Sequence, residues 1–276
     1  MEKSQSTHKK ERIDKLLVDR GLVETREKAQ ALIMAGVVFV DNQKVDKAGT
    51  KVSVDSNIEI KEKLPYVSRG GFKLEKGIKV FNVDVKDKVC LDIGASTGGF
   101  TDCLLQNGAK KVYAVDVGKN QLHEKLRKDP RVISIEEFNA RYLTSQQIPE
   151  PIDILVSDVS FISITKILPN ICNLLKDNFV GIILIKPQFE LSKKEVKDGV
   201  VKDKQLHEKA IKSVAEVLTQ SCYCVKDLDF SPIKGPKGNI EFLALIEKKK
   251  EGCKNVDENK IKQVVNQAHL VLTLDG

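Results

Sequence analysis

From about residue 68 to residue 248, short apolar segments alternate with stretches of helical periodicity, and this alternation constrains the fold most strongly. The apolar segments are VCLDIG (89–94), KVYAVDV (111–117), VISI (132–135), DILVSDV (153–159), VGIILIKP (180–187) and NIEFLALIEK (239–248). Strands that alternate with helices predict a parallel sheet covered by helices on both faces. The sequence therefore predicts an α/β domain over residues 68–248.

A smaller α+β unit is predicted before this domain, over residues 11–61. Two helices are indicated by apolar residues at helical spacing, namely Ile13, Leu16 and Leu17 and then Ala29, Leu32 and Ile33. Thr25 is the expected N-cap of the second helix, and Gly36 is its expected end. The segment VVFVDNQKV (37–45) then predicts two strands joined by an Asp-Asn turn.

The remaining segments are interpreted from their composition. Residues 1–10 are polar and predict disorder, residues 62–67 contain a proline and predict a linker, and residues 249–276 predict a charged tail in which 257–270 could form a helix. The N-terminus has no apolar signal region, and the longest apolar run, VGIILI (180–185), is far shorter than the ~18 residues of a membrane span. We therefore expect a cytoplasmic protein with no membrane partner.

Charge and cysteine content narrow the possible partners only modestly. The net charge of +7 and the pI of about 8.9 are compatible with a polyanionic partner but do not prove one. The six cysteines include no CxxC pair and no Cys/His cluster with zinc spacing, so no metal is expected. We expect all six to be free thiols in a reducing compartment.

The segment LDIGASTGGFTDCLL (91–105) is the most informative stretch for function. A buried strand ends at Asp92 and Gly94, small residues follow, and a helix comes next. Ligands of open α/β sheets bind at the carboxyl ends of strands, where glycines let the backbone approach them closely. Asp116 ends the following strand, 22 residues after Gly94, where a carboxylate can accept hydrogen bonds from both hydroxyls of a ribose. The alternative is a plain glycine-rich turn with Asp116 as a solvated strand end.

The glycine spacing is G-x-x-x-G-G rather than the dinucleotide fingerprint G-x-G-x-x-G, which favours S-adenosylmethionine over NAD as the nucleoside cofactor. Asp92 can meet the amino-acid end of that cofactor, directly or through water. The residues expected to contact it are Asp92, Gly94, Ser96, Gly98, Gly99, Phe100, Asp116, Val117, Asn139 and Asp158.

Several further motifs occur in a fixed order along nearly the whole chain. The first unit has RIDKLL (12–17), GL (21–22), TR (25–26), Ala29 and VVFV (37–40), and the second has SRGGFKL (68–74), the glycine loop, SDVSF (157–161), IKPQFE (185–190) and SPIKGPKGNIEF (231–242). The chain thereby resembles the TlyA family, which joins an S4-like RNA-binding domain to a methyltransferase domain of the FtsJ/RrmJ type. The resemblance implies a Rossmann-like, S-adenosylmethionine-dependent methyltransferase sheet behind a small S4-like domain. One departure is Asn42-Gln43, where Asn/Asp-Gly is usual at the hairpin.

The resemblance also implies a catalytic Lys-Asp-Lys-Glu tetrad, which by motif position is Lys73, Asp158, Lys186 and Glu241. Independently, Asp158 and Lys186 follow apolar strands at the end where an α/β site belongs, and charges there need partners or solvent. Lys186 is the candidate proton acceptor, whereas Lys73 and Glu241 would hold the hydroxyl that is methylated. The alternative is structural ion pairing of Lys73 with Glu241 and of Asp158 with Lys186.

Aromatic and basic residues are the candidate contacts to RNA. Phe72, Phe161 and Phe189 flank the tetrad and could stack on an extruded base, although core packing is the alternative for at least one. The basic residues expected to reach phosphates are Arg12, Lys15, Arg26 and Lys28, with a solvated helix face as the alternative.

The resemblance implies 2′-O-methylation of ribosomal RNA, in free form or within ribosomal subunits, with cytidine as the modified nucleotide. Two other functions compete with this one. The first is a non-catalytic RNA-binding or ribosome assembly factor, against which the intact tetrad and glycine loop argue. The second is a membrane-active haemolysin, a label that the family also carries, which would need a spanning segment or a strongly amphipathic apolar face.

Overall fold

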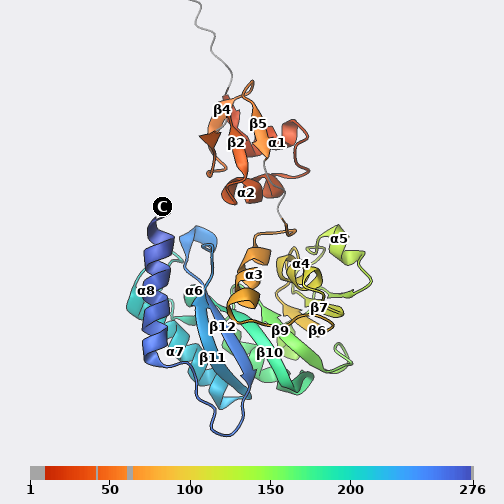
Figure 1. Cartoon of the computed structure of the whole chain (residues 1–276), viewed down its shortest axis with the longest axis vertical. Helices are drawn as coiled ribbons and strands as arrows, with labels where there is room; N and C mark the ends of the chain where they lie inside the picture. Colours follow the sequence, from red (N-terminus) through yellow and green to blue (C-terminus); the bar gives the residue numbers. More distant parts are fainter. Residues whose placement is uncertain (1–9, 42, 61–64, 275–276) are drawn as a thin grey trace, which may run out of the picture. The chain divides into compact units, whose positions relative to one another are not determined.

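The computed structural model describes residues 10–41, 43–60 and 65–274 and divides into two compact units after Arg69 (Figure 1). The units are described separately. The expected disorder of residues 1–10 and the expected linker at 62–67 fall largely outside the described residues.

Among its described residues, the first unit has two helices and two small sheets. Its elements are β1 (Lys10–Arg12), α1 (Ile13–Asp19), α2 (Arg26–Met34), β2 (Val38–Val40), β3 (Gln43–Lys44), β4 (Lys51–Ser53) and β5 (Ile58–Ile60). β1 pairs with β4, and the other three strands form a sheet in the order β3-β2-β5. The predicted strand-turn-strand at 37–45 is confirmed as β2 and β3, which pair antiparallel, although Asn42 of the turn lies outside the described residues.

Local sequence signals set the ends of α2. The Thr25 hydroxyl accepts a hydrogen bond from the backbone N–H of Lys28 at 3.2 Å, which is the expected N-cap. At the other end Gly36 adopts a φ of +70°, a left-handed conformation that favours glycine. The predicted apolar faces of both helices are buried, and Ile13, Leu17 and Ile33 are fully enclosed in the core of this unit.

The second unit is built on a seven-stranded sheet. Its strands are β6 (Val89–Ile93), β7 (Lys111–Val115), β8 (Val132–Ile135), β9 (Ile152–Ser157), β10 (Leu175–Ile185), β11 (Tyr223–Phe230) and β12 (Phe242–Lys248). Its α-helices are α3 (Gly70–Val80), α4 (Gly99–Gln106), α5 (Glu124–Arg127), α6 (Pro187–Glu190), α7 (Lys204–Gln220) and α8 (Glu258–Leu274). Short 3-10 helices are η1 (Ala140–Tyr142), η2 (Ile164–Lys166), η3 (Leu168–Leu174) and η4 (Pro236–Gly238).

The strand order is β11-β12-β10-β9-β6-β7-β8, so the chain starts at the centre of the sheet and winds outward in both directions. Strands β6 to β10 are parallel to one another, which confirms the predicted α/β fold with its Rossmann-like sheet. The expectation of a fully parallel sheet is wrong for β12, which pairs antiparallel with both β10 and β11. β12 follows β11 through a short connection, and such a connection joins antiparallel strands.

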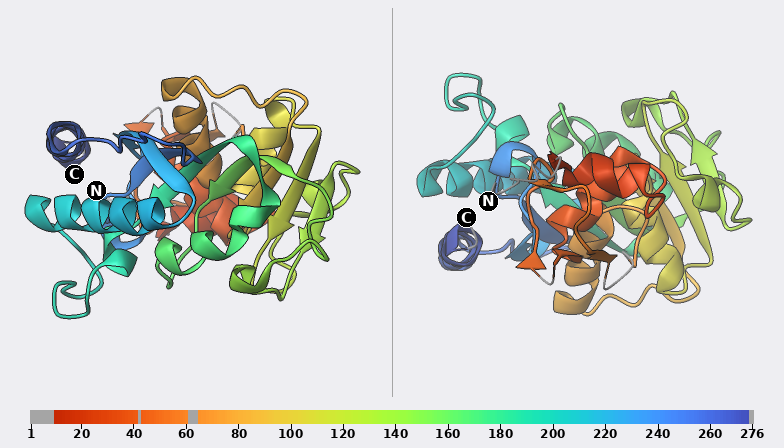
Figure 2. Two further views of the ribbon diagram at one scale, coloured as in Figure 1. Left: turned by 90° about the horizontal axis from the view of Figure 1, so that it is seen from below. Right: turned by 90° about the horizontal axis from the view of Figure 1, so that it is seen from above.

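Helices cover both faces of this sheet (Figure 2). Alternate residues of β6 point to opposite faces, as a strand requires. Leu91 and Ile93 belong to the large core cluster that also contains residues of α7 and α8, such as Ile211 and Val265. On the other face, the closest side chain to a Cβ added at Gly77 of α3 would be Ile182 of β10.

The C-terminal segment is part of the second core. The predicted helix at 257–270 is confirmed as α8, and its residues Ile261, Val265 and Ala268 are buried in the core cluster shared with the sheet. One face of α8 is apolar and packs against α7 and β11, so the helix in this charged segment belongs to the second unit.

The expectation of six free thiols is wrong for four of them. Disulfides join Cys172 to Cys222 and Cys224 to Cys253, with Cα atoms 6.1 Å apart in each pair. Cys224 lies in β11 and Cys222 directly precedes that strand, and their partners lie in η3 and in the segment after β12. These partners lie 50 and 29 residues away along the chain, so tertiary folding rather than a local motif brings them together.

Candidate active site

The four residues of the predicted tetrad come together at one edge of the sheet. Asp158 directly follows β9 and Lys186 directly follows β10, and parallel strands end at the same edge. Because β12 is antiparallel, its beginning lies at that edge too, and Glu241 directly precedes it. The register pairs Ile185 with Phe242, which places Lys186 and Glu241 side by side. Lys73 reaches them from α3.

The four side chains form a continuous chain of contacts. Lys186 Nζ lies 2.6 Å from Asp158 Oδ1 as an ion pair. Lys73 Nζ donates hydrogen bonds to Asp158 Oδ2 at 3.2 Å and to Glu241 Oε2 at 2.7 Å. Both ion pairs of the structural alternative are therefore present, and the Lys73–Asp158 contact links them into one network.

Burial and charge set the protonation of this network. The exposed fractions of the side chains are 10% for Lys73, 6% for Lys186, 18% for Asp158 and 0% for Glu241. Burial alone would lower the pKa of Lys73, but the facing Asp158 and Glu241 carboxylates outweigh it and raise that pKa. Burial would likewise raise the pKa of Asp158, and the two lysines outweigh it and lower that pKa. Lys73 is thus held as a cation and Asp158 as an anion.

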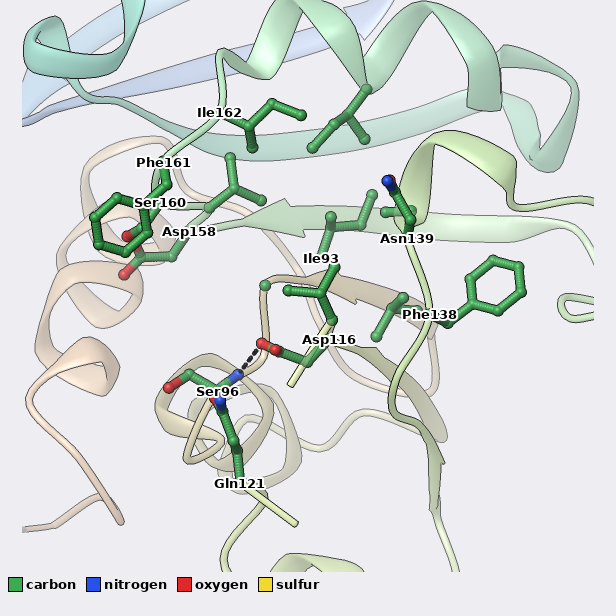
Figure 3. Close-up of a pocket in the computed structure, with 16 residues that line it drawn as sticks. Ile93, Ser96, Asp116, Gln121, Phe138, Asn139, Asp158, Ser160, Phe161 and Ile162 are labelled. Carbon is green, nitrogen blue, oxygen red and sulfur yellow. Dashed lines mark hydrogen bonds between the residues drawn. The ribbon is translucent and has the colours of Figure 1, made fainter. Parts of the chain in front are cut away.

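A pocket of about 450 Å³ adjoins the tetrad at Asp158 (Figure 3). It runs along the ends of β6, β7 and β9, and its lining includes Gly94, Ser96, Asp116, Val117 and Asn139. Together with Asp158, these are six of the ten residues expected to contact a cofactor. The volume suits a nucleoside-sized ligand.

The position directly after β6, residue 94, requires glycine. Its φ of +83° favours glycine, and a Cβ there would lie 2.9 Å from the backbone oxygen of Asp158. In addition, the Asp158 N–H donates to Ile93 O at 3.1 Å. The end of β6 is therefore held against the end of β9, which brings the pocket and the tetrad together.

Asp116 is fixed by the backbone on both sides. Its Oδ2 accepts from the Ser96 N–H at 2.8 Å and its Oδ1 from the Gly118 N–H at 2.7 Å. A carboxylate has about four acceptor positions, so two remain for a ligand. Asp116 lines the pocket, and its orientation is set before any ligand binds (Figure 3).

Asp92 is not among the residues that line the pocket, although the next two residues, Ile93 and Gly94, are. Its side chain is fully buried, and its Oδ2 accepts from the Thr101 hydroxyl at 2.7 Å. The other oxygen, Oδ1, is buried and has no hydrogen-bond partner among the described residues. Burial raises the pKa of Asp92 to about 7, an effect that the Thr101 hydrogen bond opposes. An unpartnered acceptor at this depth fits a donor from a ligand or a bridging water.

Three other expected contacts do not line the pocket, namely Gly98, Gly99 and Phe100. A Cβ at Gly98 would collide with Leu126 and Leu122, and the φ of +97° at this position also favours glycine. Phe100 is buried within α4.

Several lining residues escaped the sequence analysis. They include Gln121, Phe138, Ser160 and Ile162. Phe138 directly precedes the predicted Asn139, in the loop that follows β8. The rule that ligands bind at strand ends could have singled out this loop.

The candidate phosphate-binding residues of the first unit all have acidic partners. Arg12 Nη2 lies 2.9 Å and Arg26 Nη2 lies 2.8 Å from Oδ2 of Asp14, a side chain that is fully buried. The hydrogen bond from Arg12 lowers the pKa of Asp14, although burial opposes this. Lys15 and Lys28 form i,i+4 ion pairs with Glu11 and Glu24. All four basic side chains are about half exposed, with exposed fractions of 45% to 50%.

Over the residues that the structure describes, no helix is long and apolar enough to cross a membrane. Within the same residues, no group of three or more His, Cys, Asp or Glu could hold a metal ion.

A doubly wound sheet, a nucleoside-sized pocket at its switch point and an adjoining buried Lys-Asp-Lys-Glu network define a nucleoside-dependent α/β enzyme. Residues 66–248 match the FtsJ-like methyltransferase family and residues 11–58 match the S4 domain. The chain therefore belongs to the TlyA family of FtsJ-like methyltransferases, in which an S4 domain precedes the methyltransferase domain. The fold and the family imply S-adenosylmethionine as the methyl donor.

Relatives extend over most of the chain. YqxC of Bacillus subtilis is 48% identical over 96% of both chains. The 16S/23S rRNA (cytidine-2′-O)-methyltransferase TlyA of Mycobacterium tuberculosis is 40% identical over 84% of this chain and 88% of its own, and Hemolysin A of Brachyspira hyodysenteriae is 49% identical over 84% and 98%. A solved structure from Streptococcus thermophilus is 46% identical and covers 98% of this chain and 99% of its own, with a TM-score of 0.78.

Proposed function

We propose that this protein transfers a methyl group from S-adenosylmethionine to the ribose 2′-hydroxyl of a cytidine in ribosomal RNA. The observation that carries the proposal is the buried Lys186–Asp158–Lys73–Glu241 network, which shares Asp158 with the wall of the nucleoside-sized pocket. Cytidine and ribosomal RNA come from the name of the Mycobacterium tuberculosis relative.

The pocket residues fit the cofactor by their chemistry. The two remaining acceptor positions of Asp116 suit ribose hydroxyls, and Val117 and Phe138 offer apolar surface to a base. The unpartnered Oδ1 of Asp92 suits the ammonium end of the amino-acid moiety, directly or through water. Bound S-adenosylmethionine supplies an electrophilic methyl group, whose bond to sulfur breaks as its bond to the ribose oxygen forms.

Lys186 takes the proton that the hydroxyl releases. A neutral amine is needed for this role, and the ammonium that results lies 2.6 Å from the Asp158 carboxylate, which stabilises it. Lys73 is already paired with two carboxylates, so it serves as a fixed positive charge that positions the reacting groups. Because an in-line transfer depends on alignment, most of the acceleration comes from this positioning.

The position of the Phe161 ring is evidence for an RNA substrate whose target base is unstacked from its neighbours. Its side chain is 91% exposed, although it is large and apolar, and it lines the pocket. Its ring centroid lies 5.4 Å from that of Phe189, which is three residues after Lys186. An exposed ring beside the reacting groups can stack on a base, and each such contact contributes roughly 1–3 kcal/mol.

The decisive experiment is to map 2′-O-methyl groups on ribosomal RNA after incubation with the protein and S-adenosylmethionine. Free RNA and both ribosomal subunits serve as substrates, and Lys186→Ala is the matched control. New methyl groups at cytidines with wild type, and none with the variant, support the proposal. Methylation of a base, or identical effects of both proteins on subunit assembly, would contradict it.

Cofactor binding has its own test in calorimetry. Asp116→Ala removes the acceptors for the ribose hydroxyls and should weaken S-adenosylmethionine binding by roughly 1–3 kcal/mol. Asp102→Ala removes a carboxylate from α4 outside the pocket lining and serves as the control. Binding of NAD with no response to S-adenosylmethionine would refute the assignment of the cofactor.

A further inference from the structure

Ser160 contacts the proposed proton acceptor from outside the tetrad. Lys186 Nζ donates a hydrogen bond to Ser160 Oγ at 2.9 Å. The second oxygen neighbour of the amine is Asp158 Oδ1, at 2.6 Å as an ion pair. Ser160 therefore joins Asp158 as an oxygen neighbour of the Lys186 amine, and it also lines the cofactor pocket.

The loop that carries Ser160 is tied to the segment that carries Lys186. Glu190, four residues after Lys186, accepts hydrogen bonds from the Ile164 N–H at 3.0 Å and from the Ser163 hydroxyl. The contact between the Phe161 and Phe189 rings joins the same two segments. The Ser160 hydroxyl is thus held near the Lys186 amine by three separate contacts, although Ser160 itself is solvent-exposed.

The hydrogen bond between Lys186 and Ser160 affects the direction in which the lone pair of a neutral amine points. A neutral lysine has two N–H donors and one lone pair, whereas an ammonium has three donors. Asp158 Oδ1 and Ser160 Oγ are two oxygen neighbours of Lys186 Nζ, so together they can engage both N–H groups of the neutral form. The lone pair must then point away from both oxygens.

We propose that Ser160 is a positioning residue, which holds the Lys186 amine so that its lone pair faces the ribose hydroxyl. The proposal rests on the methyl transfer proposed above. In the reaction the hydroxyl proton moves to Lys186 Nζ as the new carbon–oxygen bond forms and the carbon–sulfur bond breaks. Ser160 gains and loses no proton, because it accepts the same hydrogen bond before and after the transfer.

Ser160→Ala and Ser160→Thr form a matched pair of variants. Alanine removes the acceptor, whereas threonine keeps a hydroxyl and adds one methyl group at an exposed position. Misaligned groups can cost up to about 10²-fold in rate, so we expect kcat of Ser160→Ala to fall by roughly 10- to 100-fold. The KM for RNA and the Kd for S-adenosylmethionine should stay near the wild-type values, and Ser160→Thr should recover most of kcat.

Two results would overturn the role of Ser160. One is a wild-type kcat for Ser160→Ala, and the other is a loss that lies wholly in KM or in cofactor binding. The ¹⁵N signal of the Lys186 amine, assigned with Lys186→Arg, gives a readout without turnover. It should shift in Ser160→Ala and return in Ser160→Thr. A shifted signal in a protein that methylates no ribosomal RNA would instead refute the proposed function and leave only the contact.

Discussion

Each unit of the chain contains a carboxylate that bridges two cations, yet the two arrangements suit different chemistry. Asp14 joins Arg12 to Arg26, and Asp158 joins Lys73 to Lys186. The two arginines are about half exposed, whereas the exposed fractions of the two lysines are 10% and 6%. Burial of the cations is therefore the main difference between the two clusters.

The type of cation completes the contrast. A guanidinium keeps its proton in proteins and presents a planar set of donors, which suits phosphate binding from an exposed position. A lysine amine can exist in neutral form and can then accept a proton. The exposed cluster is thus suited to holding RNA, and the buried one is suited to moving a proton.

Replacement of Lys186 should have the largest effect. Lys186→Ala should lower methylation by roughly 10²–10⁴-fold, the usual contribution of a general base, while RNA and cofactor still bind. Lys186→Arg should give no rescue, because arginine cannot accept the proton. Single-turnover rates between pH 6 and 10 give the measurement, and the wild-type rate should rise with pH while chemistry limits turnover. An active arginine variant with the wild-type pH profile would show that only positive charge matters here.

Replacement of Gly235 should have the next largest effect. Its φ of −75° suits any residue, but an added Cβ would collide with Oε1 of Glu241. Gly235→Ala should displace that carboxylate from Lys73 and lower kcat by about 10²-fold. In a Glu241→Ala background the same change should cost little, because the colliding atom is gone. Equal losses in both backgrounds would mean that the loop, rather than Glu241, is disturbed.

Much of this site could be predicted because strand ends and motif order are local properties. Asp158 and Lys186 end apolar runs, so the rule for parallel sheets already places them at one edge. Glu241 precedes its strand, and it reaches the same edge only because β12 is antiparallel. Strand periodicity carries no information on direction, so this part of the site came from the family motif.

Long-range partners could not be read from the sequence. The interpretation of the cysteines failed because η3 and the segment after β12 approach β11 only in the folded chain. Ser160 was visible in the SDVSF motif, but nothing local indicates that its hydroxyl faces Lys186. Gly98 was assigned to the cofactor, whereas Leu126 of α5 occupies the space beside it.

Asp14→Asn tests whether the cluster of Arg12, Asp14 and Arg26 also stabilises the first unit. The pKa of Asp14 is lowered in the fold, so its contribution to stability is present above the unfolded value near ~3.9 and is lost as the pH falls. At neutral pH the variant should lose about 2 kcal/mol, since an amide nitrogen would face guanidinium donors. Between pH 5 and 2 the variant should lose less stability than wild type. Urea unfolding followed by the methyl signals of Leu17 measures the stability of the first unit, and the signals of Ile183 report on the other unit. If the stability of wild type and variant fell equally steeply with pH below pH 4, Asp14 would not stabilise the fold through its charge.

The smallest expected effect is that of Lys28→Gln, which should change RNA binding without changing stability. Lys28, in the first turn of α2, pairs with Glu24 just before that helix, and Lys79 pairs with Glu75 at the same i,i+4 spacing within α3 of the other unit. Each pair contributes only about 0.3–0.5 kcal/mol to stability, so Lys28→Gln and Lys79→Gln should both fold like wild type. If Lys28 contacts a phosphate, its loss should flatten the dependence of log affinity on log salt by roughly 0.7–0.9, whereas Lys79→Gln should leave the slope unchanged. Filter binding to ribosomal RNA gives both slopes. The salt range is roughly 50–200 mM, where phosphate contacts make the affinity strongly dependent on salt. Equal slopes for the two variants would mean that Lys28 is a solvated helix residue, and Arg12, Lys15 and Arg26 would remain the candidate phosphate contacts of that unit.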